Sequence, residues 1–207
     1  MRIDPDNPVL LGMQTVFDVL AATFFFALGC LPLVTAGASL IAVYDTMAAI
    51  AGRRCGGVMR KFFSSFRANL VPGLKLLALA LGAGLVLWLD IFACWGRGME
   101  PSPVLSAMRG LTIFALAVYL AFLTYLSAGT AKYIVTTGQA LHNALYWTAG
   151  HPLLTLGMVL LWVVMVLAVW VVWFYAFVVI AAGLYGQALL LRRAMAEPDG
   201  EKNRGQD

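Results

Sequence analysis

Four charged side chains lie inside long apolar stretches of this sequence, where they could do chemistry that lipid alone cannot. They are Asp18, Asp45, Lys75 and Asp90. On insertion scales a charged residue at the centre of a membrane helix costs about 2.5–3.5 kcal/mol, so each is a candidate for proton transfer, substrate binding or a buried ion pair. The alternative is interfacial, with Asp18 at the start of a span, Lys75 snorkelling to the surface and Asp90 near the outer headgroups.

Asp18, Asp45 and Lys75 can lie at one depth in the membrane. If the chain reverses at Pro32, Asp18 precedes that residue by 14 positions and Asp45 follows it by 13. Both are then roughly 20 Å from the turn. Lys75 enters the next span from the opposite side and is about 8 Å deep in a core about 30 Å thick. The three residues are therefore a candidate polar cluster, with separate interfacial positions as the alternative.

The other reactive residues form no recognised catalytic or metal-binding motif. His142 and His151 are nine positions apart with no acidic residue nearby, and the three cysteines, at positions 30, 55 and 94, have no CxxC spacing. The sequence has no HExxH, P-loop, GxGxxG or Ser/His/Asp arrangement. We expect a protein that is not an enzyme and that uses no cofactor or metal.

The elements that position the charged residues follow from a very apolar composition. Of 207 residues, 62% are hydrophobic and 12% are charged, whereas a soluble domain has about 25% charged residues. Lipid is therefore the solvent, and in lipid the backbone must satisfy its own hydrogen bonds. The apolar runs are too continuous for a barrel, so we predict an all-α fold. It is a polytopic transmembrane helical bundle, one membrane domain over residues 1–207.

Four spans are predicted within residues 70–191. Residues 70–95 and 110–127 supply two of them. Residues 152–191 contain no charged side chain, and as one helix they would be about 60 Å long, twice the thickness of the hydrocarbon core. We therefore divide them into two spans that reverse near residues 170–175.

The first apolar stretch, residues 9–51, has two interpretations because Pro32 interrupts it. Proline removes a helix hydrogen bond and either bends or ends a helix. A reversal at Pro32 gives a hairpin and six membrane segments, whereas a kink gives one long helix and five.

Basic residues between positions 52 and 69 set the predicted orientation. Cytoplasmic loops are enriched in lysine and arginine, so we place this loop, and the polar tail 192–207 that begins with Arg192 and Arg193, in the cytoplasm. Phe62, Phe63 and Phe66 recur there at helical spacing, which is typical of a helix in the interface with its rings in acyl chains. Its cations would contact anionic lipid headgroups rather than nucleic acid. These cations are Arg53, Arg54, Arg60, Lys61 and Arg67.

Residues 16–75 resemble the YesL-like family of bacterial integral membrane proteins, a domain of unknown function. The resemblance is carried by the segment LPLVTAGAS at positions 31–39 and by FFSSFRAN at positions 62–69. Beyond Asn69 the match is mainly one of hydropathy. The resemblance implies a multi-pass protein of the bacterial plasma membrane, often encoded near carbohydrate ABC importers and without an established activity.

The family-motif residues Pro32, Thr35, Gly37, Phe62, Phe66 and Asn69 have structural interpretations. Thr35 can offer its hydroxyl to a carbonyl that the proline leaves free. Asn69 can cap a helix that begins at Leu70.

Two functions follow from these observations. The resemblance implies a non-enzymatic accessory or regulatory partner of a carbohydrate-uptake system, in contact with ABC permease or sensor-kinase subunits. The intramembrane charges instead indicate a small transporter or lipid-handling protein, whose signature would be a cavity that reaches Asp18, Asp45 or Lys75.

Overall fold

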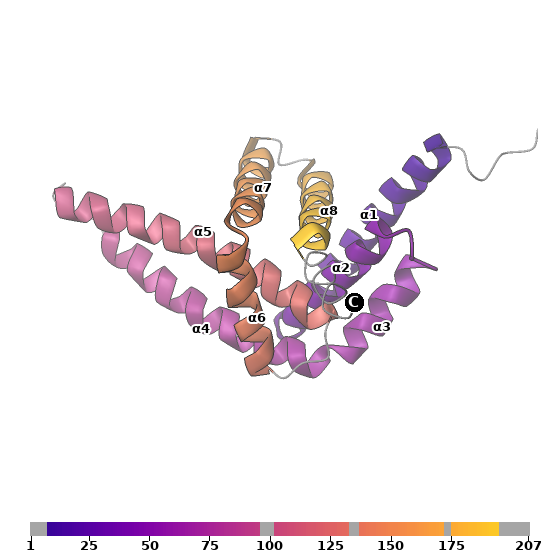
Figure 1. Ribbon diagram of the computed structural model, residues 1–207, viewed down its shortest axis with the longest axis horizontal. Helices are drawn as coiled ribbons and strands as arrows, with labels where there is room; N and C mark the ends of the chain where they lie inside the picture. Colours follow the sequence, from indigo (N-terminus) through magenta and orange to yellow (C-terminus); the bar gives the residue numbers. More distant parts are fainter. Residues whose placement is uncertain (1–7, 96–101, 133–136, 172–174, 195–207) are drawn as a thin grey trace, which may run out of the picture.

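The computed structural model describes residues 8–95, 102–132, 137–171 and 175–194 (Figure 1). All regular elements in these ranges are helices, as predicted. They are α1 (Pro8–Cys30), η1 (Leu33–Thr35), α2 (Ala36–Ala51), α3 (Val58–Ala68), α4 (Leu70–Cys94), α5 (Pro103–Lys132), α6 (Thr137–Gly150), α7 (Pro152–Val171) and α8 (Ala176–Ala194).

Six stretches of helix are long and apolar enough to cross a membrane, which supports the six-segment alternative. The stretch 9–51 is divided between α1 and α2, and 152–191 is divided between α7 and α8 with the break where it was predicted. The fifth helix is longer than expected, since α5 begins at Pro103 rather than near Gly110. The predicted turn at 96–103 and the tail beyond residue 194 lie mostly outside the described residues.

At the reversal near Pro32, Thr35 donates hydrogen bonds to backbone carbonyls. The Thr35 hydroxyl donates to the carbonyl oxygen of Gly29 at 2.7 Å and to that of Pro32 at 2.9 Å. The Thr35 amide donates to the Pro32 carbonyl at 2.9 Å. Thr35 thus has the hydrogen-bonding role that its sequence position predicts, which matters because an unpaired carbonyl in lipid is costly.

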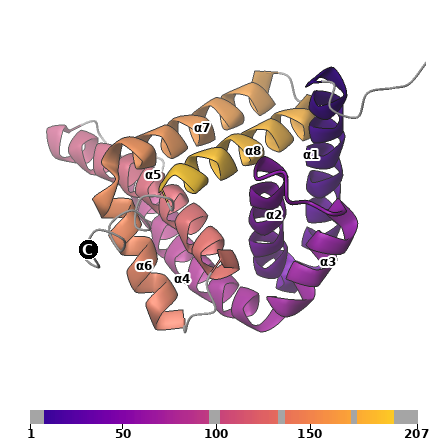
Figure 2. The ribbon, with the colours of Figure 1, turned by 45° about the vertical axis from the view of Figure 1, so that its right-hand side comes forward.

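α2 occupies the centre of the bundle (Figure 2). Buried residues make up 56% of its most apolar window, against 6% for α4, and it contacts α1, α3, α4, α5 and α8. Its first turn lies against the first turn of α4, where Gly37 faces Gly73. A Cβ atom at Gly37 would overlap the Gly73 carbonyl, and one at Gly73 would overlap the backbone of Ala38. Only glycines allow this approach of two backbones.

The amphipathic helix α3 runs back along α2 and packs on α1. Phe62 is 1% exposed and lies between Phe25 of α1 and Phe66, with ring centroids 6.0 and 6.1 Å apart. The prediction that Phe62 inserts into acyl chains is therefore wrong, because α1 supplies the apolar surface that lipid was expected to supply, while Phe66 is half-buried. Phe63, which is 37% exposed, is the one exposed phenylalanine of α3.

Asn69 serves the end of α3 rather than the start of α4. Its side-chain nitrogen donates to the Ser65 carbonyl at 2.8 Å, and it makes no capping hydrogen bond to α4. The predicted N-cap is therefore incorrect. Since α4 follows α3 directly, the first amides of α4 are paired by helical bonds such as Gly73 to the Asn69 carbonyl at 2.8 Å.

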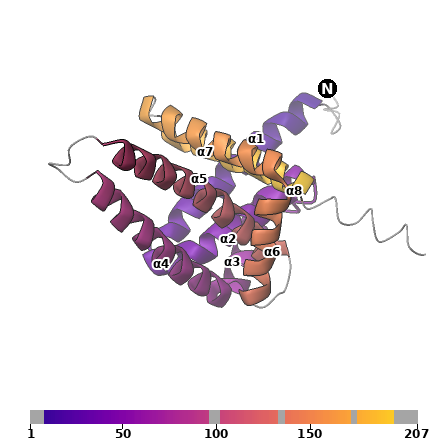
Figure 3. The ribbon, with the colours of Figure 1, turned by 60° about the vertical axis from the view of Figure 1, so that its left-hand side comes forward.

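Four of the remaining helices form two hairpins, while α6 packs mainly against α5. α4 and α5 extend side by side away from the rest of the bundle (Figures 1 and 3), and α7 lies beside α8 (Figure 2). The Tyr119 hydroxyl donates to the Ala80 carbonyl at 2.7 Å and ties α5 to α4. The Trp162 indole donates to the Thr124 hydroxyl at 3.2 Å and ties α7 to α5.

We predict that Gly37→Ala destabilises the fold while Gly82→Ala does not. Overpacking a tight contact typically costs about 1–3 kcal/mol, and a Cβ at Gly37 meets backbone that cannot rotate away. A Cβ at Gly82 of α4 meets nothing within 4 Å, so alanine there gains helix propensity. Thermal unfolding of the purified protein in an uncharged detergent measures both changes, and equal melting temperatures for the two variants would contradict the contact.

Candidate functional site

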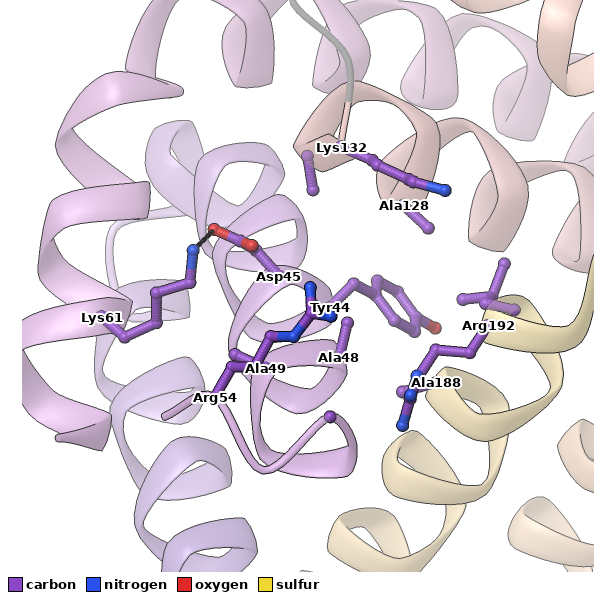
Figure 4. Close-up of a pocket in the computed structure, with 13 residues that line it drawn as sticks. Tyr44, Asp45, Ala48, Ala49, Arg54, Lys61, Ala128, Lys132, Ala188 and Arg192 are labelled. Carbon is purple, nitrogen blue, oxygen red and sulfur yellow. Dashed lines mark ion pairs between the residues drawn. The ribbon is translucent and has the colours of Figure 1, made fainter. Parts of the chain in front are cut away.

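A cavity of about 620 Å³ lies where α2, α5 and α8 end (Figure 4). Small residues on these three helices leave the space open, and charged residues surround it. We call it the basic cavity. Its lining residues are Tyr44, Asp45, Ala48, Ala49, Gly52, Arg54, Lys61, Ala128, Ala131, Lys132, Ala188, Leu191 and Arg192.

Asp45 and Lys61 form an ion pair at the wall of this cavity. The Lys61 ammonium lies 2.8 Å from a carboxylate oxygen of Asp45, and their side chains are 40% and 22% exposed. A pair this exposed typically contributes about 0–1 kcal/mol to stability. The pair is formed because α3 returns along α2 and brings Lys61 level with Asp45.

Of the candidate cluster Asp18, Asp45 and Lys75, only Asp45 lines the basic cavity. Asp45 pairs with Lys61, while Asp18 is half-buried on α1 and Lys75 is exposed on α4. The prediction placed the starts of α2 and α4 on opposite sides of the membrane, whereas their first turns are in contact. Lys75 follows Gly73 of this contact by two residues. Asp45 follows Gly37 by eight residues, which places it about 12 Å further along α2.

Arg54 is positioned by the turn that ends α2. The Arg53 amide donates to the Ile50 carbonyl and the Arg54 amide to the Ala49 carbonyl, each at 2.9 Å. This is the Schellman pattern, which requires a left-handed residue after the helix. Arg53 takes that conformation with φ 52°, and it is the only such non-glycine residue in the described ranges. The turn leaves the Arg54 side chain at the cavity (Figure 4).

Arg192 enters the cavity from α8 and also stabilises the end of α2. One of its guanidinium nitrogens donates to the Ala51 carbonyl, a group that the helix itself leaves without a partner. Lys132, the last residue of α5, lines the third side. The cavity is therefore lined by four cationic side chains from four different elements and by one carboxylate, that of Asp45.

Helix ends oppose part of this positive charge. The carboxyl end of a helix acts as about half a negative charge, so three such ends amount to about −1.5. The lining side chains carry a formal charge of +3. The positive term is the larger of the two, so the basic cavity favours an anion.

Tyr44, which lines the inner wall of the cavity, belongs to a buried polar pair. The Tyr44 hydroxyl donates to the Gln187 side-chain oxygen at 2.5 Å. Both residues are almost completely buried, and the Gln187 side-chain nitrogen is the one buried side-chain polar atom in the described part of the chain that lacks a hydrogen-bond partner. The pair joins α2 to α8 immediately inside the charged rim.

Two further groups of polar residues lie away from the basic cavity. Arg60 and Arg67 line an open surface groove of about 830 Å³ along α3, together with Phe63. Near the far end of the α4–α5 hairpin, Asp90 accepts a hydrogen bond from Thr112 at 2.5 Å. Among the described residues, no three histidine, cysteine or acidic side chains lie close enough to hold a metal ion.

Several cavity residues were not predicted as site residues. Lys132, Tyr44 and Gln187 stand in ordinary helical sequence, and nothing in their spacing links them. Arg192 was used for orientation only. The available signal was that basic residues stand at the ends of three apolar helices, at positions 53–54, 132 and 192–193. Basic residues at the ends of spans favour the cytoplasmic side, so they indicate that these helix ends lie together.

Comparison with known proteins finds one family model that matches part of the chain. Residues 19–91 match the model of the family described as "Protein of unknown function, DUF624". This range contains most of the stretch on which the resemblance described above rests, and it supplies the α2 and α3 walls of the basic cavity but not those from α5 and α8. No curated protein and no solved structure matches the chain.

We predict that Tyr44→Phe destabilises the protein and that Gln187→Leu largely compensates for it. Removing the hydroxyl leaves the whole Gln187 side-chain amide unpaired, and a buried group without a partner costs about 1–3 kcal/mol. Replacing both partners by apolar groups removes that cost. Melting temperatures of the two single variants and the double variant form a double-mutant cycle. Additive losses would show that the hydrogen bond contributes nothing.

Proposed function

We propose that this protein is a multi-pass membrane protein that binds an anionic ligand in the basic cavity and acts in transport or lipid handling. One observation carries the proposal. A cavity of the size typical of small-molecule sites reaches the intramembrane carboxylate Asp45 and has a surplus of positive charge around it. This is the signature that distinguishes a transport or lipid-handling protein from a purely structural bundle.

The surplus charge supports binding of an anion rather than a cation. Lys61 already neutralises Asp45. Arg54 and Arg192 add positive charge to the same walls, which five alanines share, so the cavity offers both charge and apolar surface. We propose binding without catalysis, since the lining residues include no nucleophile beside a general base.

The basic cavity faces the cytoplasm in this proposal. Arg54, Lys61 and Arg192 belong to segments whose lysine and arginine content is typical of cytoplasmic loops in a bacterial plasma membrane. Packing supports placing these segments on one side, because Arg192 reaches the end of α2 across the cavity.

The accessory role in carbohydrate uptake that the family resemblance implies stays a prediction. It is compatible with an anion-binding cavity, since a regulatory subunit needs a site for the molecule to which it responds. Contact of the protein with permease or sensor-kinase subunits likewise stays a prediction.

We expect multivalent anions to raise the melting temperature of the purified chain in uncharged detergent. The panel is inorganic phosphate, sulfate and citrate against sodium chloride of equal ionic strength. A ligand at 100 times its Kd adds about 2.7 kcal/mol of stability, which for a chain of this size is a shift of about 5–10 °C.

Matched variants separate a site from a general salt effect. Arg54→Gln and Arg192→Gln should each reduce the shift, whereas Arg53→Gln and Arg193→Gln should not, because Arg53 and Arg193 are exposed neighbours that do not line the cavity. If neither this panel nor a larger organic anion, soluble or in a lipid, stabilises the wild-type chain more than chloride does, the proposed function fails.

We expect Cys55, in the turn after α2, to be reached from the cytoplasm only. A membrane-impermeant maleimide should leave it unlabelled in intact cells and label it after permeabilisation, with the modified peptide identified by mass spectrometry. Because Cys55 is half-buried, a Gly56→Cys variant provides an exposed neighbour in open space. Labelling of either thiol in intact cells would reverse the proposed orientation.

A further inference from the structure

We infer that the ligand of the basic cavity carries a phosphate monoester. This inference rests on the proposed function and names the chemical class of the anion. It draws on three properties of the cavity, namely its charge balance, the type of its donors and the uncharged surface between them.

The charge balance fits a doubly charged group. Lys61 pairs with Asp45, and Arg54 and Arg192 bring two further positive charges to the walls, part of which the helix ends offset. A phosphate monoester carries about −1.5 to −2 at pH 7. A single carboxylate would leave part of the positive charge uncompensated, and a neutral ligand would leave all of it.

The donors fit the geometry of a phosphoryl group. Arg54 and Arg192 both line the cavity, one from the turn after α2 and the other from α8 (Figure 4). A guanidinium presents parallel N–H groups that match two oxygens of a phosphate, whereas an ammonium acts as a point charge. Two guanidiniums from different elements can hold different oxygens of one phosphoryl group, and Lys132 supplies a further charge.

The cavity also has room for more than the phosphoryl group. Its volume of about 620 Å³ is in the range of sites that bind whole small molecules. Alanines from α2, α5 and α8 form much of its wall, and an uncharged surface of this kind suits an uncharged ligand body. A phosphate monoester with a neutral body is available both as a soluble metabolite and as the headgroup of an anionic lipid.

The test uses the full chain with glycerol 3-phosphate as the soluble probe and phosphatidic acid in mixed micelles as the lipid probe. Inorganic phosphate and citrate complete the set, and melting temperature is the readout. We expect at least one monoester probe to raise the melting temperature by about 5–10 °C at saturation and at lower concentration than citrate. The shift should be reduced in Arg54→Gln and retained in Arg53→Gln.

The outcomes of this experiment distinguish a lipid ligand from a soluble one. They also distinguish failure of this inference from failure of the proposed function. A shift with phosphatidic acid alone assigns a lipid headgroup, and a shift with glycerol 3-phosphate alone assigns a soluble ester. If citrate stabilises the chain and neither monoester does, the inference is overturned while anion binding stands. If none of the four probes acts, both are overturned.

A second variant tests the charge balance directly. Asp45→Asn removes the one carboxylate from the cavity wall and frees Lys61, so the monoester that binds wild type should bind severalfold more tightly. Weaker binding in Asp45→Asn, in a variant that melts at the wild-type temperature without ligand, would overturn the inference.

Discussion

The backbone contact between Gly37 and Gly73 determines where the central helix lies. In lipid there is little hydrophobic drive for helices to associate, so close packing and hydrogen bonds must supply the attraction. The two glycines let the first turns of α2 and α4 touch. Once α2 is held there, α3 must return along it to connect the two helices, and this return brings Lys61 to Asp45. The wall of the basic cavity is thus a consequence of a contact at the other end of α2.

The basic end of the bundle is an electrostatic compromise. Three helices finish around one space, and the dipoles at their carboxyl ends oppose the positive charge of the side chains there. Arg192 shows both sides of the compromise, since it hydrogen-bonds the end of α2 and also lines the cavity. A bundle that needed only to neutralise its helix ends would require fewer cations than these four lining residues. This excess of positive charge is the basis of the proposal that the cavity binds an anion.

Local signals in the sequence were sufficient to predict most of the long helices and several of their boundaries. Pro32 marked an interruption that could be a reversal or a kink, and the length of an uncharged run required a break between α7 and α8. The site depended on how helices cross, which periodicity does not encode. The prediction assumed that α4 starts on the side opposite the start of α2, and from that assumption it placed Asp45 and Lys75 at one depth as members of a candidate cluster. Nothing local showed that Gly37 would meet Gly73 and make Lys61 the partner.

The distance along the chain between the two sides of the cavity has a consequence for biosynthesis. Tyr44 and its partner Gln187 are 143 residues apart, and Arg192 reaches a carbonyl 141 residues before it. α1 to α4 can therefore enter the membrane before either partner has left the ribosome. Until α8 arrives, Tyr44 has no Gln187 to bond, the end of α2 lacks its arginine and the cavity has no third wall. The final helix thus completes the basic cavity, so a nascent chain that stops short of α8 contains most of the bundle but lacks one wall of the cavity.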